Sequence, residues 1–124
     1  MAGEDNVAAA KRGYAAFSAG DAAAAMEEMA DDIVWVVPGN SAISGTTHGK
    51  QELGEMWGRM AEKGFSVSPQ YWFSDDERVV VLSHNTLAGE QVDVADVLTF
   101  RDGKLARFQT TSDTALLERV FGTA

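Results

Sequence analysis

The stretch YAAFSAGDAAAAMEEMADDIVWVVPG, residues 14–39, passes from an alanine-rich half to a half dominated by β-branched and aromatic residues. Alanine favours helices, whereas valine, isoleucine and tryptophan favour strands. Gly20 can end one helix and Asp21 can cap the next, so the pattern predicts a helical hairpin. Pro38 cannot continue a central strand, which predicts that a strand ends there. The order of helices followed by a strand favours an α+β fold.

The sequence on either side of this stretch extends the same pattern. Toward the N-terminus, apolar side chains recur at intervals of three and four residues, which predicts a first helix that buries one stripe. The stripe consists of Val7, Ala10, Tyr14 and Phe17. Downstream, residues 40–48 are predicted as a loop. Residues 49–63 restore the helical spacing, and we expect a third helix there that ends at Gly64.

The rest of the chain breaks into short apolar segments separated by polar turns. The segments 65–74, 78–87, 91–100 and 104–112 are rich in β-branched and aromatic residues. Their spacing is typical of an antiparallel meander, and residues 114–122 predict a short final helix. Three helices from the N-terminal half, packed on one face of a strongly curved antiparallel sheet, would leave a conical hollow. Such a hollow is the default binding site.

The composition describes one soluble globular domain, which we expect to span residues 1–124. The chain has 124 residues, 45% of them hydrophobic, no cysteine and a formal charge of −9. The negative charge disfavours nucleic acid and anionic membranes as partners. We find neither a signal peptide pattern nor an apolar run of the roughly 20 residues that span a membrane, so we expect a cytoplasmic protein. The spacing of histidines and carboxylates predicts no metal site, and no motif predicts a cofactor.

Asp96 is the strongest candidate for chemistry. In the predicted strand QVDVADVLTF, residues 91–100, a period of two places this carboxyl group on one face with four apolar neighbours, namely Val92, Val94, Leu98 and Phe100. A carboxylate there loses hydration, so it must be paired, hydrogen-bonded or protonated near neutrality. The protonated form can donate to a carbonyl or enolate oxygen, and the ionised form can act as a base. Alternatively, Asp96 faces a subunit interface or a wet pocket mouth and has no role.

Two further groups are candidates to assist Asp96. His84 lies within a predicted strand and could titrate near pH 7. Its direction depends on the turn to the next strand: a two-residue turn places Ser83 opposite Asp96, whereas a three-residue loop places Leu82 there and brings His84 onto the face of Asp96. Tyr14 lies on the buried helical stripe, with its hydroxyl directed at the hollow or at a strand carbonyl. Simple packing or pairing with a neighbour is the alternative for both residues.

Apolar side chains on the predicted inward faces are candidates for the wall of the hollow. Trp35 shares a strand face with Val37, and Trp57 shares a helix face with Met60. Thr110 alternates with Phe108 on the last strand and would add a hydroxyl group. Packing alone also explains such side chains. The predicted ligand-binding wall consists of Phe17, Trp35, Val37, Met56, Trp57, Met60, Leu98, Phe100, Phe108 and Thr110.

Three strings of the sequence are similar to a known family. They are residues 14–39, quoted above, SGTTHGKQELGEMW at 44–57 and VADVLTFRDGKLARF at 94–108. Together they resemble the SnoaL-like polyketide cyclases and the wider NTF2-like superfamily, which includes ketosteroid isomerase. The resemblance covers nearly the whole chain. It implies an NTF2-like α+β cone with a pocket for a small apolar molecule, and a homodimer formed through the outer face of the sheet.

The resemblance carries over only part of a catalytic site. The position of the ketosteroid isomerase base is Val37, so a ketosteroid isomerase mechanism is not expected. The position of its hydrogen-bonding tyrosine is Gly13, one residue before Tyr14, and the position of its buried carboxylic acid is Asp96. SnoaL-like cyclases pair a carboxylate with a histidine, and Asp96 with His84 is the nearest equivalent. The resemblance implies a cofactor-free isomerase, cyclase or lyase acting on a carbonyl compound, or else a non-catalytic ligand-binding or dimerisation module.

Overall fold

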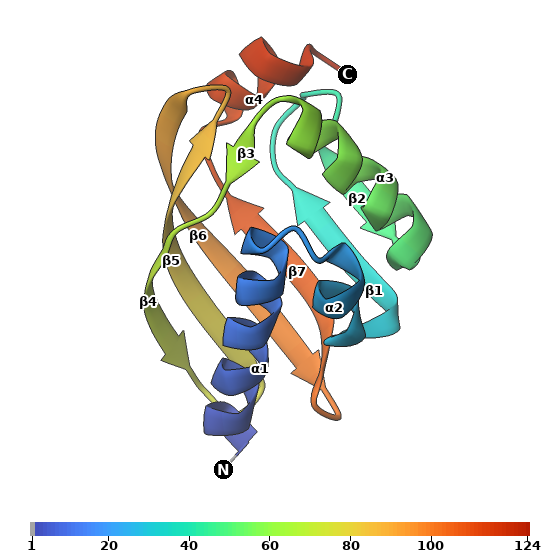
Figure 1. Ribbon diagram of the computed structural model, residues 1–124, viewed down its shortest axis with the longest axis vertical. Helices are drawn as coiled ribbons and strands as arrows, with labels where there is room; N and C mark the ends of the chain where they lie inside the picture. The colour runs from blue at the N-terminus through green and yellow to red at the C-terminus, as the bar shows by residue number, and fades with distance from the viewer. Residues whose placement is uncertain (1) are drawn as a thin grey trace.

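The computed structural model describes residues 2–124, which form four helices and a strongly curled seven-stranded sheet (Figure 1). The predicted α+β fold is thereby confirmed. The helices are α1 (Ala2–Ser18), α2 (Ala22–Glu27), α3 (Gly49–Glu62) and α4 (Thr114–Phe121). The strands are β1 (Met29–Val37), β2 (Gly45–His48), β3 (Phe65–Ser66), β4 (Pro69–Ser74), β5 (Arg78–Leu87), β6 (Glu90–Arg101) and β7 (Lys104–Thr111).

The helical hairpin of α1 and α2 forms as the sequence predicts. Gly20 adopts a φ of 78°, in the left-handed region that favours glycine at the end of a helix. The Asp21 carboxylate accepts a hydrogen bond from the backbone N–H of Ala24 and so caps α2. From its composition, the second helix is predicted to continue to about Ala30, and this end is wrong, because Met29 already belongs to β1. Met29 lies opposite Leu105 of β7. This pairing places the backbone of Met29 in the sheet, and a helix that continued through Met29 would prevent it.

The order of strands in the sheet is β2-β1-β7-β6-β5-β3, with β4 also paired to β5. All neighbours are antiparallel except β1 and β7, which are parallel, so the sheet is mixed and the prediction of a purely antiparallel sheet is wrong. Strand β2 lies in the predicted loop at 40–48, where it pairs with the end of β1. The segment at 65–74 splits into β3 and β4, because Pro69 lacks the N–H that a continuous ladder requires.

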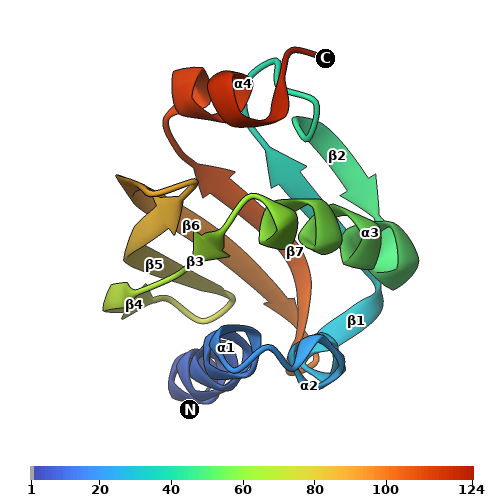
Figure 2. The same ribbon diagram turned by 45° about the horizontal axis from the view of Figure 1, so that its top comes forward.

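Helices α1, α2 and α3 lie on the same side of the sheet, and α4 lies across one end of it (Figure 2). Helix α1 contacts β4, β5 and β7, whereas α3 contacts β1, β2 and β3. The two helices therefore cover different parts of the sheet. Among the described residues, no helix has the length and apolar composition that crossing a membrane requires.

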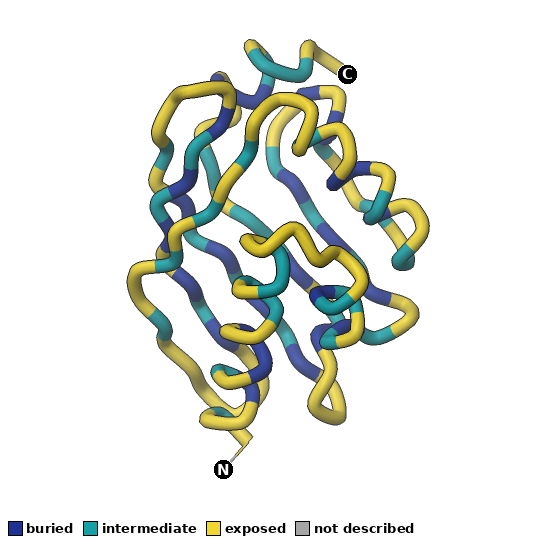
Figure 3. The backbone as a smooth tube through the Cα atoms, in the orientation of Figure 1, coloured by how far each residue is buried: buried dark blue, intermediate teal, exposed yellow. Residues whose placement is uncertain are grey.

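Burial alternates along the central strands (Figure 3). In β6, the buried side chains are Val94, Asp96, Leu98 and Phe100, while their neighbours in sequence are partly or fully exposed. This is the face on which the sequence placed Asp96. The inner face of the sheet and the helices above it thus enclose one carboxyl group among apolar side chains.

Candidate functional site

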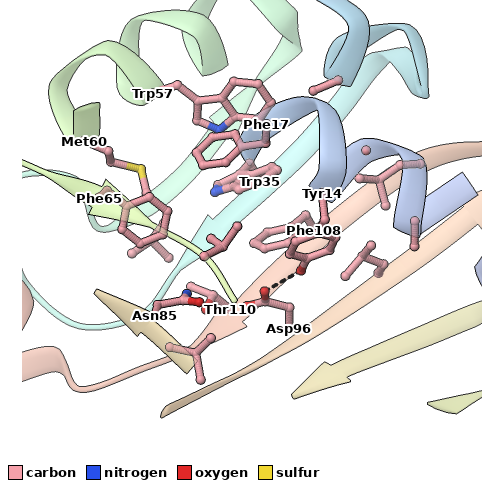
Figure 4. A pocket seen from close by; sticks show the side chains of 18 of the residues that line it. Tyr14, Phe17, Trp35, Trp57, Met60, Phe65, Asn85, Asp96, Phe108 and Thr110 are labelled. Carbon is pink, nitrogen blue, oxygen red and sulfur yellow. Dashed lines mark hydrogen bonds between the residues drawn. The ribbon is translucent and has the colours of Figure 1, made fainter. Parts of the chain in front are cut away.

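A cavity of about 110 Å³ lies between the inner face of the sheet and helices α1 and α3 (Figure 4). An engineered protein cavity of about 150 Å³ binds benzene, so this space is on the scale of a single ring. Most of the predicted wall lines the cavity, namely Phe17, Trp35, Val37, Trp57, Met60, Leu98, Phe100, Phe108 and Thr110.

Met56 is the exception in the predicted wall. It is 1% exposed and belongs to the hydrophobic core, but it does not line the cavity. Adjacent residues of a helix point about 100° apart, so α3 directs Trp57 into the cavity and turns Met56 toward the core. The sequence could show that this helix has an apolar face but not which part of that face borders the cavity.

Aromatic rings hold the shape of the cavity. Trp35 and Phe108 are opposite residues of the parallel strands β1 and β7, and their rings stack with centroids 3.6 Å apart and planes 12° apart. Trp57 meets Trp35 edge-on at 5.7 Å, and Phe17 meets Trp57 edge-on at 5.0 Å. Edge-to-face contacts are a favourable arrangement for aromatic pairs. The rings therefore form a connected wall that links the sheet to α1 and α3.

Asp96 and Tyr14 form a buried hydrogen bond at this wall. The Tyr14 hydroxyl donates to Oδ2 of Asp96 at 2.5 Å, and Asp96 is 3% exposed. Trp72 and Thr110 belong to the same row of the sheet as Asp96. The Trp72 ring packs edge-on against Tyr14, with centroids 5.4 Å apart, and so fixes the phenol ring in place. The sequence analysis allowed the Tyr14 hydroxyl to face either the hollow or a strand carbonyl, and in the structure it contacts Asp96.

This environment changes the acidity of both groups. Burial raises the pKa of Asp96 to about 6, although hydrogen bonds from Tyr14 and Thr110 oppose that rise. Burial of the hydroxyl and the nearby Asp96 charge raise the pKa of Tyr14 well above its usual range. Tyr14 therefore remains a hydrogen-bond donor near neutral pH, while Asp96 can both lose and regain a proton. A general acid or base works best with a pKa near the working pH.

Asn85 is a polar group of the cavity that sequence reasoning missed. It is 4% exposed, lines the cavity, and accepts a hydrogen bond from the Ser83 hydroxyl through Oδ1 at 2.6 Å. That bond orients the amide and leaves its nitrogen as a donor for a bound molecule. The alternation of buried residues in β5 could have indicated Asn85, but only once the facing of that strand was known.

His84 lies on the opposite face of the sheet from Asp96. Its Nδ1 is 2.6 Å from Oδ1 of Asp93, and its side chain is 42% exposed. That hydrogen bond raises the pKa of His84. Val81 lies opposite Asp96, so both predicted registers of β5 against β6 are wrong. His84 therefore does not belong to the candidate site. The physical reason is the turn between β5 and β6, which consists of Ala88 and Gly89 and shifts the pairing.

The described residues contain no group of three or more His, Asp or Glu side chains that could hold a metal ion. Val37 borders the cavity with an apolar side chain. The polar side chains that line the cavity include the Asp96–Tyr14 pair, Thr110 and Asn85. Together they can transfer a proton and donate hydrogen bonds to a developing negative charge.

Comparison with solved structures places the chain in the NTF2-like fold. Bal32a, from a soil-derived mobile gene cassette, is 25% identical with a TM-score of 0.90, and the alignment covers 98% of this chain and 99% of that one. An NTF2-like protein from Burkholderia xenovorans is 24% identical with a TM-score of 0.81 and coverage of 98% of each chain. TerC, co-crystallised with polyporic acid, is 24% identical with a TM-score of 0.85 and coverage of 96% and 99%. No curated protein matches the sequence significantly.

The family comparison agrees with the fold. The sequence pattern of the SnoaL-like domain matches residues 10–108, which begin in α1 and end in β7. That range contains both members of the Asp96–Tyr14 pair and most of the cavity wall. The chain therefore belongs to the family of SnoaL-like domains.

Proposed function

We propose that the cavity binds a small, largely apolar carbonyl compound and that Asp96 and Tyr14 catalyse a proton transfer on it without a cofactor. The reaction class is an isomerisation, a cyclisation or an elimination. The observation that carries this proposal is the hydrogen-bonded Asp96–Tyr14 pair, buried in an otherwise apolar cavity. A carboxyl group is costly to bury, and a pKa near neutrality makes it useful as an acid or a base.

The geometry supports a division of roles within the site. Tyr14 donates to Oδ2 of Asp96, and a carboxylate has further lone pairs with which it can remove a proton from the carbon beside the substrate carbonyl. The electron pair of that C–H bond moves onto the carbonyl oxygen and forms an enolate, which the Asn85 amide can stabilise with a hydrogen bond. In an isomerisation, the enolate regains the proton from Asp96 at another carbon. In a cyclisation, it attacks a second carbonyl within the same molecule, and the alkoxide that forms takes the proton from Asp96. In an elimination, it expels a leaving group, which departs with its bonding electron pair and takes that proton. These three outcomes correspond to the three reaction classes.

A specific observation favours a second candidate function, a non-catalytic binding protein. Val37 stands where the resemblance to ketosteroid isomerase implies a catalytic base, so the cavity lacks a second carboxylate there. The similar protein TerC was co-crystallised with polyporic acid, which supports ligand binding in this fold. In this alternative, Asp96 and Tyr14 would serve as hydrogen-bonding groups for the bound compound.

Proton exchange at carbon tests the catalytic proposal. Cyclohexanone and acetophenone would be incubated with the protein in D₂O, and deuterium incorporation beside the carbonyl would be followed by NMR. Because a positioned general base contributes about 10²–10⁴-fold, Asp96→Asn should slow the protein-dependent exchange by about 100-fold or more. Asp93→Asn is the matched control, since Asp93 is a carboxylate of the same strand that faces outward. Binding without exchange would favour the non-catalytic alternative.

We also propose that the chain forms a homodimer through the outer face of the sheet. Tyr71 and Phe73 of β4 are 62% and 56% exposed, and Leu82, opposite Tyr71, is 38% exposed. Large apolar side chains that gather on one exposed surface commonly mark an interface. Sedimentation of the wild type should give a dimer, and Phe73→Lys should give a monomer. A wild type that sediments as a monomer would contradict this proposal.

A further inference from the structure

We propose that the cavity extends past Gly13 between α1 and α2, and that the absence of a side chain at Gly13 selects neutral ring ketones that carry an alkyl branch. This inference rests on the proposed binding function and specifies the class of compound. Gly13 has no part in the acid–base chemistry, so its substitution changes the shape of the cavity without removing a reacting group.

The starting observation is a glycine that neither backbone conformation nor close packing explains. Gly13 lies within α1, where the helical backbone has a negative φ that any residue adopts. If a Cβ atom were added, no other atom of the described residues would lie within 4 Å of it, apart from the adjacent residues and the backbone of its own helix. At Gly3 of the same helix, the added atom would lie 2.9 Å from the backbone oxygen of Asp75. Glycine lowers helix stability relative to alanine, so the glycine at position 13 requires another explanation.

The open space at Gly13 belongs to the cavity, because Gly13 itself lines it. Residues four positions apart lie on the same face of a helix, so a side chain at position 13 would follow the row of Ala9 and Phe17, which also line the cavity. Gly58 of α3 is a helical glycine with equally open surroundings, but it is exposed and does not line the cavity. Gly13 therefore differs from Gly58 in that its open space faces the interior.

Helix α2 and the start of β1 form the other side of this space. Ala25 of α2 is 1% exposed, Met29 of β1 is buried, and both line the cavity. The Arg12 guanidinium donates from Nε and Nη2 to Oε1 of Glu28, at 3.1 and 2.9 Å, and so joins α1 to the end of α2 next to Gly13. Figure 2 shows the two helices side by side. The space at Gly13 therefore lies between two joined helices.

This branch of the cavity begins beside the acidic pair. Gly13 directly precedes Tyr14, whose hydroxyl donates to Asp96. Adjacent residues of a helix point about 100° apart, so the open space lies to one side of the phenol. A compound whose carbonyl group meets Asp96 and Tyr14 can therefore direct a substituent of its ring past Gly13.

The lining of the branch determines which substituent it accepts. Ala9, Ala25 and Met29 are apolar, and Glu28 is the charged side chain at this part of the lining. Among the described residues that line the cavity, none is a lysine, arginine or histidine, so an anionic substituent would lose hydration beside Glu28 without a cation in the lining. A neutral alkyl group fits this environment, and each methylene group that it buries contributes about fourfold in affinity.

Three ketones test this inference. Cyclohexanone has no branch, whereas 3-ethylcyclohexanone and 4-ethylcyclohexanone carry the same branch at two positions of the ring. Calorimetry would measure their affinities for the wild type, Gly13→Ala, Gly13→Leu and the control Gly58→Leu. The control makes the same change at a helical glycine outside the cavity. All three variants should have a higher thermal midpoint than the wild type, because alanine and leucine favour helices more than glycine does.

We expect the wild type to bind at least one ethyl ketone about tenfold more tightly than cyclohexanone. Gly13→Ala should reduce this preference by about fourfold, and Gly13→Leu should abolish it, because the added carbon atoms occupy the place of the ethyl group. Both variants should keep their affinity for cyclohexanone, and Gly58→Leu should keep the preference of the wild type. In NMR spectra of the complex with the wild type, the ethyl protons should show nuclear Overhauser contacts with the two Hα protons of Gly13.

The possible failures are distinguishable. An unchanged preference in Gly13→Leu, an equal loss of all three ketones in both Gly13 variants, or the absence of contacts between the ethyl group and Gly13 would overturn the inference. So would a wild type that binds cyclohexanone but gains nothing from the ethyl group. The proposed binding function would survive each of these results. If the wild type binds neither these ketones nor acetophenone, the binding function fails, and this inference fails with it.

Discussion

Replacing Asp96 by asparagine should stabilise the protein at pH 8 and change its stability little at pH 4. The pKa of Asp96 is raised from 3.8 to about 6 by burial. Between these values the folded protein holds the proton more tightly than the unfolded chain does, so stability falls as the pH rises through this window. At about 1.4 kcal/mol per pKa unit, the burial of the charged form costs on the order of 3 kcal/mol at pH 8.

Asparagine removes this cost because it is never ionised. Its carbonyl oxygen can still accept the hydrogen bond from Tyr14, although a neutral acceptor forms a weaker bond than a carboxylate. We therefore expect a net gain of roughly 1–3 kcal/mol in the free energy of unfolding at pH 8. Urea unfolding of the wild type and the variant at several pH values between 4 and 8 measures the difference, in which the titration of all other groups cancels.

Asp93→Asn is the control for an exposed carboxylate of the same strand. Because it removes the hydrogen bond that raises the pKa of His84, it should lower stability at acid pH and give no gain at pH 8. Two results would refute the reasoning. If the difference between the wild type and Asp96→Asn does not vary with pH, the carboxyl group is not desolvated in the folded state. If the variant is less stable at pH 8, the ionised carboxylate is a stabilising partner in the fold, and a role as an acid or base loses its physical basis.

Three further predictions follow from the same contacts. Tyr14→Phe removes a donor that lowers the pKa of Asp96, so the midpoint of any pH-dependent exchange activity should move to higher pH; an unchanged midpoint would show that the bond does not tune the acid. His84→Ala should leave ligand affinity within about twofold in calorimetry, because His84 faces away from the cavity; a large loss would place the histidine at the site. Ala88 has a φ of 51°, so Ala88→Gly should raise the thermal midpoint, with a gain of up to about 1 kcal/mol; a lower midpoint would mean that the turn is unstrained.

The facing of Asp96 was predictable because it depends on local alternation alone. A strand whose even positions are apolar buries that face, whatever its neighbours are. The register of β5 against β6 was not predictable, because it depends on the turn. By composition, Gly89 and Glu90 are predicted to form a two-residue turn. In the structure, the turn consists of Ala88 and Gly89, and Ala88 adopts a left-handed backbone conformation. This shift of the turn altered the partners of every residue in the hairpin.

Local sequence patterns also could not predict which distant segments of the chain lie next to each other. The stacking of Trp35 on Phe108 requires β1 and β7 to be adjacent and parallel, and nothing in either segment specifies the other as its neighbour. The same holds for the position of Met56. Amphipathic spacing identifies the buried face of α3, but the boundary between core and cavity on that face depends on how the helix lies over the sheet.

The Asp96–Tyr14 contact forms although Tyr14 stands one residue away from the position that the resemblance to ketosteroid isomerase implies. Counting from the joint between α1 and α2, the resemblance placed the tyrosine of ketosteroid isomerase at Gly13, and a shift of one residue turns a helical side chain by about 100°. Here Tyr14 still reaches Asp96 at 2.5 Å. The pairing must therefore depend on how α1 lies on the sheet, where Trp72 supports the ring. Because Val37 provides no carboxylate beside the pair, the proposed reaction would use Asp96 both to remove and to return the proton, which limits it to transfers within the reach of that side chain.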